Sequence, residues 1–144
     1  DATILGAASL RRLGLTQHAA NILDSDVMLP AAGQGAIGVL TRQGDWTVEE
    51  LILPMNHPPT NICISAERAF LKAIGGDRRM PIAALGRLAS DKILVLEGLA
   101  GQPDGTSIIR LQRSGSIEEA EKIGAELGEE MKSRIPLDLF KEWG

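Results

Sequence analysis

The chain has 144 residues, of which 44% are apolar and 24% charged, and its formal net charge at pH 7 is −4. This size predicts a soluble protein with a moderate core, and the acidic balance without a Lys/Arg run argues against a nucleic-acid partner. No apolar stretch approaches the roughly 18 residues that a membrane helix needs, and no signal peptide opens the chain, so we expect a cytoplasmic protein without a membrane partner. A single cysteine excludes an internal disulfide framework.

The first part of the chain predicts several short elements. Residues 10–23 carry apolar side chains at loosely helical spacing, and residues 36–40 are predicted as a buried strand. Residues 47–55 are predicted as a helix capped by Thr47. Residues 56–59 end in two prolines, which remove backbone donors and restrict the residues before them, so we expect a stiff, non-helical connection and a domain boundary there.

The rest of the chain predicts a small α+β domain. Its expected elements are a helix at 60–74 ending at Gly75-Gly76, strands at 81–88 and 92–100, a turn at 102–105, a strand at 106–112 and a last helix that begins with a capping box at 116–119. In the second strand, Leu94 and Leu96 are expected on one face and Ile93 and Val95 on the other. The apolar stripe of the last helix comprises Ala120, Ile123, Gly124, Leu127 and Met131.

A run from Pro30 to Val39 places three glycines and the amide of Gln34 among apolar residues. Glycine permits a positive φ and leaves no side chain between the backbone and a ligand, so this run is suited to binding. The competing interpretation is a tight turn that leads into a buried strand.

Four segments, by their order and spacing, carry a family resemblance. They are Leu10-Arg11-Arg12-Leu13-Gly14-Leu15, Leu29 to Gly38 with its Gly-Gln-Gly, Asn56-His57, and Ala66-Glu67-Arg68-Ala69-Phe70-Leu71 followed by Gly75-Gly76 and Pro81-Ile82-Ala83. Together they resemble the porphobilinogen deaminases, also called hydroxymethylbilane synthases. The resemblance covers nearly the whole chain but only the C-terminal half of the three-domain family members.

The resemblance implies a fold of α/β plus α+β class. Remnants of two periplasmic-binding-protein-like α/β domains would precede a small α+β C-terminal domain, in which a three-stranded antiparallel sheet has helices on one face. Residues 1–25 would end the second α/β domain, with 1–6 as the last part of a strand. Residues 26–59 would form the return segment into the first domain, and residues 60–144 the cofactor-carrying C-terminal domain.

The activity that the resemblance implies is a transferase reaction of tetrapyrrole and haem biosynthesis. Four porphobilinogen molecules are joined head to tail into hydroxymethylbilane with loss of ammonia, while a dipyrromethane cofactor holds the growing pyrrole chain. The implied partners are porphobilinogen, the growing chain and a missing N-terminal half, which carries the catalytic aspartate of the family. We therefore expect no catalytic residue in this chain, and no activity from the chain alone.

The resemblance also implies a set of binding residues. Arg12 matches an arginine that faces substrate or cofactor carboxylates, which a guanidinium binds bidentately with a charge that does not titrate. Arg11 is expected to be merely exposed. Gln34 and Gly35 match positions beside the cofactor, where amide and backbone groups bind its carboxylates and ring nitrogens.

Four other polar residues are candidates for a functional role. Glu67 and Arg68 could form a catalytic pair, but the favoured interpretation is that Glu67 forms an interdomain salt bridge and that Arg68 is solvated. His18 and His57 are far apart in sequence, with no cysteine or carboxylate pair near either, so no metal site is expected.

The cofactor-attachment position departs from the family pattern. The family forms a thioether through a cysteine in a Cys-x-x-Pro loop after Gly-Gly, and counting back from Pro81 places Arg78 there. Arginine cannot form a thioether, and Cys63 is expected to be a small buried apolar residue. Arg78 could be an engineered or sequencing change, or mark a protein without activity.

Two alternatives to a synthase part stay open. One is a non-catalytic domain derived from the family that binds anionic pyrroles or another protein. The other is a fragment of a solute-binding protein, which gives no reason for the motif at residues 66–71.

Overall fold

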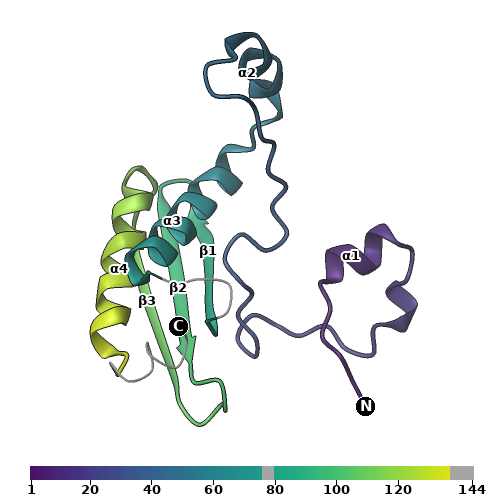
Figure 1. The fold of residues 1–144 in the computed structure, drawn as a ribbon, viewed down its shortest axis with the longest axis vertical. Helices are drawn as coiled ribbons and strands as arrows, with labels where there is room; N and C mark the ends of the chain where they lie inside the picture. Colours follow the sequence, from purple (N-terminus) through teal and green to yellow (C-terminus); the bar gives the residue numbers. More distant parts are fainter. Residues whose placement is uncertain (76–79, 137–144) are drawn as a thin grey trace.

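The computed structural model describes residues 1–75 and 80–136. Its elements in chain order are α1 (Ala7–Arg12), η1 (Thr16–His18), α2 (Trp46–Ile52), η2 (Leu53–Met55), α3 (Pro58–Ile74), β1 (Ile82–Ser90), β2 (Ile93–Gly101), β3 (Ile108–Ser116), η3 (Ile117–Glu119) and α4 (Ala120–Arg134). Figure 1 shows that α3, α4 and the strands pack together, whereas α1 and α2 lie away from the sheet.

The sheet is antiparallel with the order β1-β2-β3, so β1 and β3 are its edge strands. Helices α3 and α4 cover one face (Figure 1). Leu94 and Leu96 are fully buried, while Ile93 on the other face of β2 is 41% exposed. The expected three-stranded antiparallel sheet with helices on one face, and the alternation along its second strand, are confirmed.

Glycines allow the layers of this domain to approach closely. A Cβ on Gly98 of β2 would lie 2.5 Å from the ring of Phe70 in α3, and one on Gly128 of α4 would lie 2.7 Å from the Phe70 carbonyl oxygen. Phe70 itself is fully buried. The predicted apolar stripe of the last helix is buried along its whole length, as the close contact between α3 and α4 requires.

Helix α3 begins at Pro58, so the prediction that residues 56–59 are wholly non-helical was wrong. The two prolines occupy the first turn, where a backbone N–H has no partner inside the helix and the fixed φ of proline suits the helical conformation. The helix ends as predicted at Gly75, whose φ of 76° is left-handed and whose N–H donates to the carbonyl oxygens of Leu71 and Lys72.

One predicted helix cap was misplaced, and a second one caps a short helix that precedes the predicted long one. Asp45, not Thr47, caps α2, since its carboxylate accepts a hydrogen bond of 3.4 Å from the Val48 N–H. The Ser116 hydroxyl accepts from the Glu118 N–H and so caps the short helix η3, and α4 begins at Ala120. The cap of α2 therefore lies two residues before the predicted one, whereas Glu119, which precedes α4, makes no side-chain cap hydrogen bond.

Residues 1–57, all of which the structure describes, contain no strand and only one buried residue, Leu29. The predicted strand at 36–40 is wrong for this structure, as is the strand end at 1–6. Ile37 is 95% exposed and Leu40 is 99% exposed. Because no strand of the described chain lies beside residues 36–40, their backbone has nothing to pair with.

Candidate functional site

The loop around Gln34 is a double turn that only glycine accommodates. The Gln34 N–H donates to the Ala31 carbonyl oxygen at 3.0 Å, and the Ala36 N–H donates to the Gly33 carbonyl oxygen at 3.1 Å. Gly33 and Gly35 have φ values of 77° and 83°, a conformation that other residues rarely adopt. We call residues 31–36 the glycine loop.

The tip of the glycine loop has unused polar groups. Within residues 1–75 and 80–136, no acceptor takes the N–H of Gly35, and the Gln34 side chain is exposed. The Gln34 side-chain nitrogen lies against Gly6, where an added Cβ would come within 3.2 Å of it. The loop therefore presents one backbone donor and one amide beside the start of α1.

Arg12 lies at the opposite end of α1 from Gly6, in the last turn of the helix. Its side chain is exposed, and in the described part of the chain it forms no hydrogen bond or ion pair. The structure thus brings the glycine loop next to α1 but does not bring Arg12 into contact with Gln34 or Gly35. Arg11 is exposed as well.

The glycine loop is attached to the sheet by a buried carboxylate. Glu67 in α3 is only 3% exposed. One of its oxygens, Oε2, accepts a hydrogen bond of 2.7 Å from the Gly33 N–H, and Oε1 accepts one of 2.8 Å from the Gly86 N–H in β1. Burial raises the pKa of Glu67, and the two N–H donors act in the opposite direction.

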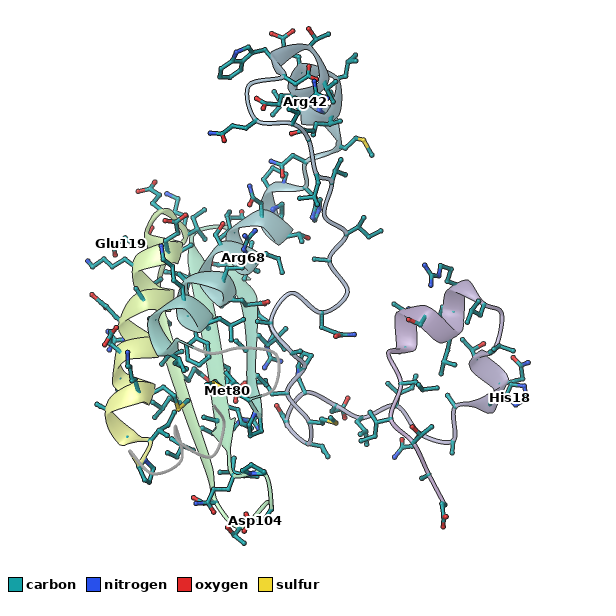
Figure 2. All side chains as sticks on the ribbon, viewed as in Figure 1. His18, Arg42, Arg68, Met80, Asp104 and Glu119 are labelled. Atoms are coloured by element: carbon teal, nitrogen blue, oxygen red, sulfur yellow. The ribbon has the colours of Figure 1, made fainter. Side chains whose placement is uncertain are left out.

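The salt bridge expected at Glu67 is absent among the described residues, where both oxygens are bound by backbone N–H groups instead. Arg68, the next residue, is exposed as expected (Figure 2). The sequence does show an acidic residue on the apolar side of a helix, which indicates a buried carboxylate. It does not show which groups bind that carboxylate.

Two arginines of the sheet bind the chain before the glycine loop. On the face away from the helices, the Arg110 guanidinium donates to the carbonyl oxygens of Ser25 at 3.0 Å and Asp26 at 2.6 Å. Arg87 donates to the Ser25 hydroxyl at 3.1 Å. Glu97 lies between the two arginines and forms an ion pair with each. Sequence reasoning missed this network, which alternation along β1, β2 and β3 places on one face.

Residues 25–33 therefore form what we call the β1-edge segment. It is bound to the open face of the sheet at its start and to Glu67 at its end. Between these points, the Pro30 carbonyl oxygen accepts the Ala84 N–H at 3.2 Å, and Leu29 is buried. Because β1 is an edge strand, this segment and Glu67 supply partners for backbone donors that a sheet edge leaves free.

Cys63, the single cysteine of the chain, is half-buried on α3. A Cβ added at Gly86 would lie 3.0 Å from its Cβ, so the residue lies directly over β1. Burial and the charge of Glu67 both raise the pKa of the thiol, which makes it a poor nucleophile. Arg78, the predicted attachment position, lies outside the described residues.

The described residues hold no group of three or more side chains suited to bind a metal ion. His57 shares a hydrogen bond of 2.8 Å with the Thr60 hydroxyl at the start of α3, and His18 lies near α1, away from the sheet (Figure 2). None of the helices in the described ranges combines the length and the apolar character needed to cross a membrane.

Two family models match successive parts of the chain. Residues 1–50 match "Porphobilinogen deaminase, dipyromethane cofactor binding domain", and residues 61–133 match "Porphobilinogen deaminase, C-terminal domain". The second match covers the α3/α4 and sheet domain, and the first contains Arg12 and the glycine loop.

Curated relatives give the same result. A porphobilinogen deaminase of Roseiflexus castenholzii is 45% identical over 131 residues, which are 91% of this chain and 43% of the relative. One of Carboxydothermus hydrogenoformans is 42% identical over 99% of this chain and 45% of the relative, and a chloroplastic one of Pisum sativum is 42% identical over 96% and 38%. The chain spans less than half the length of these relatives, and it belongs to the porphobilinogen deaminase family.

Proposed function

We propose that this chain is the C-terminal part of a hydroxymethylbilane synthase, which joins four porphobilinogen molecules head to tail with loss of ammonia. The observation that carries the proposal is the match of residues 1–50 and 61–133 to two successive domains of one family. The relatives bear the name of this deaminase and are more than twice as long as the matched region. The reaction would belong to cytoplasmic tetrapyrrole and haem biosynthesis.

The non-covalent part of the cofactor site would consist of Arg12, Gln34 and Gly35. The cofactor, a dipyrromethane, carries carboxylates and ring nitrogens, and when bound it anchors the growing pyrrole chain. The exposed guanidinium of Arg12 suits a carboxylate, and the free N–H of Gly35 suits any anionic oxygen. The Gln34 amide offers both a donor and an acceptor. These residues fit an anionic pyrrole.

The residues present do not fit a covalent attachment of the cofactor. Arg78 stands where the family pattern has its cysteine, and Cys63 is half-buried over β1 with a raised pKa. We therefore propose that this chain binds the dipyrromethane without a thioether.

Activity would also require a second polypeptide region, the N-terminal half of the enzyme. We propose that residues 1–25 and 26–59 complete two periplasmic-binding-protein-like α/β domains whose other elements that region supplies, and that residues 60–144 form the third domain. Supporting this, large apolar side chains such as Trp46, Leu51 and Ile37 are more than 70% exposed, and residues 36–40 have no strand beside them. Alone, the chain would be inactive.

The test combines the chain with the region of the relatives that it does not cover. We would co-express it with the N-terminal part of the Carboxydothermus relative that it does not cover, and measure porphobilinogen consumption and intact mass. We expect association without a covalent adduct. An Arg78→Cys variant should gain the adduct and consume porphobilinogen.

Two matched variants then test the site. In the Arg78→Cys background, Arg12→Ala should reduce consumption at least tenfold, because a charge-assisted hydrogen bond is worth about 1.5–3 kcal/mol. The neighbouring Arg11→Ala should leave consumption unchanged. If the Arg78→Cys chain gains neither adduct nor activity, while the C-terminal part of the Carboxydothermus relative gains both, the proposal is wrong.

A second candidate is a non-catalytic domain that binds anionic pyrroles or another protein. The observation in its favour is Arg78, since an added positive charge near a pyrrole site retains anions without a thioether. Tight binding of porphobilinogen by the associated halves, with no consumption even by the Arg78→Cys variant, would favour it.

A further inference from the structure

We infer that Glu67 is a positioning residue for the glycine loop, because its buried carboxylate fixes Gly33 against β1 and thereby sets where Gln34 and Gly35 meet an anionic ligand. The identity of that ligand rests on the proposed function. The positioning itself rests on contacts within the chain.

Glu67 joins three separate parts of the chain. It lies within the 17-residue helix α3, and its two oxygens accept hydrogen bonds of 2.7 Å from Gly33 and 2.8 Å from Gly86. Gly86 is itself held in β1, where it pairs with Leu96. The helix and the strand thus fix the position of the carboxylate, and the carboxylate in turn binds Gly33.

The buried side chain at position 67 is a carboxylate for a chemical reason. At 3% exposure, an apolar side chain would fill this place without the cost of burying a charge. A carboxylate is the side chain that offers two acceptor oxygens at a fixed separation and no donor. Each of the two backbone donors binds its own oxygen, so both are satisfied by a carboxylate, whereas glutamine has one oxygen and a donor NH2 group in place of the other.

Gly33 is linked by a hydrogen bond to the far side of the glycine loop. The N–H of Gly33 is held by Glu67, and its carbonyl oxygen accepts the Ala36 N–H at 3.1 Å. Both polar groups of this residue are therefore fixed, and Gln34 and Gly35 lie between the two bonded positions. A shift of Gly33 displaces the free N–H of Gly35 and the amide of Gln34 together.

The β1-edge segment has other attachments that do not involve Glu67. Pro30 binds Ala84, and Ser25 and Asp26 bind Arg110. Loss of the Glu67 carboxylate should therefore release the glycine loop while the start of the segment stays bound.

The experiment measures amide hydrogen exchange by NMR on the full chain. In the unmodified chain, the Gly33 amide should exchange at least tenfold more slowly than that of Gly35, since a hydrogen bond to a charged group contributes about 1.5–3 kcal/mol. In Glu67→Gln, exchange at Gly33 should accelerate by about tenfold or more, with amides shared by β2 and β3 unchanged. Arg68→Gln, an exposed change one residue away, is the control.

Porphobilinogen, added to the same three proteins, tests the consequence for binding. Its carboxylates should shift the Gly35 amide resonance in the unmodified chain and in Arg68→Gln, and bind several-fold more weakly to Glu67→Gln. If Gly33 is released but porphobilinogen binds equally well, the positioning role is overturned and the proposed function stands.

Two further outcomes are decisive. If the unmodified chain does not bind porphobilinogen, the ligand role of the loop is overturned, while the exchange data still decide whether Glu67 fixes Gly33. If Glu67→Gln fails to fold, the comparison of Gly33 with Gly35 in the unmodified chain decides, and equal exchange at the two amides overturns the inference.

Discussion

Gly124 of α4 lies so close to Ala66 of α3 that a Cβ built on the glycine would overlap the carbonyl oxygen of the alanine. That oxygen belongs to the backbone of a packed helix and cannot move aside. We expect Gly124→Ala to lower the free energy of unfolding by about 2 kcal/mol, because overpacking outweighs the roughly 1 kcal/mol gain in helix propensity. Urea denaturation followed by circular dichroism measures this change.

Glu129→Ala is the control for that measurement. It also introduces alanine into α4, but at an exposed position, so the free energy of unfolding should change by about 0.5 kcal/mol or less. A Gly124→Ala variant as stable as this control would contradict the close packing of α3 and α4.

Arg110 should hold the start of the β1-edge segment on the sheet. We expect Arg110→Ala to increase the rate of proteolytic cleavage between residues 19 and 29 several-fold, because two hydrogen bonds to the carbonyl oxygens of Ser25 and Asp26 are lost. Mass spectrometry of the fragments identifies the site.

The matched control is Arg113→Ala on the same strand. Arg113 faces the helices, where it pairs with Glu126 and Glu130 of α4. Its loss should leave cleavage between residues 19 and 29 unchanged, and equal acceleration by both variants would mean that the effect is a general loss of stability.

Limited proteolysis of the unmodified, isolated chain should separate its two parts. We expect residues 61–134 to resist and residues 1–55 to be cut, because the first range contains the packed helices and sheet whereas the second contains one buried residue. Equal protection of both ranges in a monomer, established by light scattering, would contradict this expectation.

Stability should depend on pH through Glu67. Burial raises the pKa of this carboxyl above its ordinary value of 4.5, so above that pH the folded chain retains a proton that the unfolded chain has lost. The contribution of Glu67 to the free energy of unfolding is therefore greatest below pH 4.5 and falls as pH rises through the folded pKa.

Urea denaturation at a series of pH values, compared with Glu67→Gln, isolates this effect. The stability of the unmodified chain relative to the variant should decrease as pH rises. A relative stability that increases with pH would mean that the two N–H donors, not burial, dominate the pKa.

The second half of the fold was predictable because its signals are local and agree with one another. Gly75 ended a helix of regular apolar spacing, and Leu94 and Leu96 alternated with their neighbours along a strand, so the end of the helix and the faces of that strand appeared as expected. Cap positions were less predictable, since Asp45 and Thr47 are both good caps and the sequence does not rank them.

The first half was not predictable in the same way. Residues 36–40 have the composition of a buried strand, but a strand needs a partner, and the described chain offers none. For the site, the glycines that need a positive φ were visible in the sequence, whereas the hydrogen bond between Gly33 and Glu67 depends on tertiary packing. The domain boundaries and the roles of Arg12, Gln34, Gly35 and Arg78 stay predictions.

The β1-edge segment limits where this chain can be shortened without exposing the edge of β1. A fragment that began at residue 58 would keep the helices and the sheet but lose the carbonyl oxygen of Pro30 and the N–H of Gly33. Its edge strand would then be free to pair with the same strand of another molecule, and Glu67 would be left with one donor. We therefore expect the solubility of the C-terminal domain to depend on five residues, 29–33, that match the family model of the preceding domain.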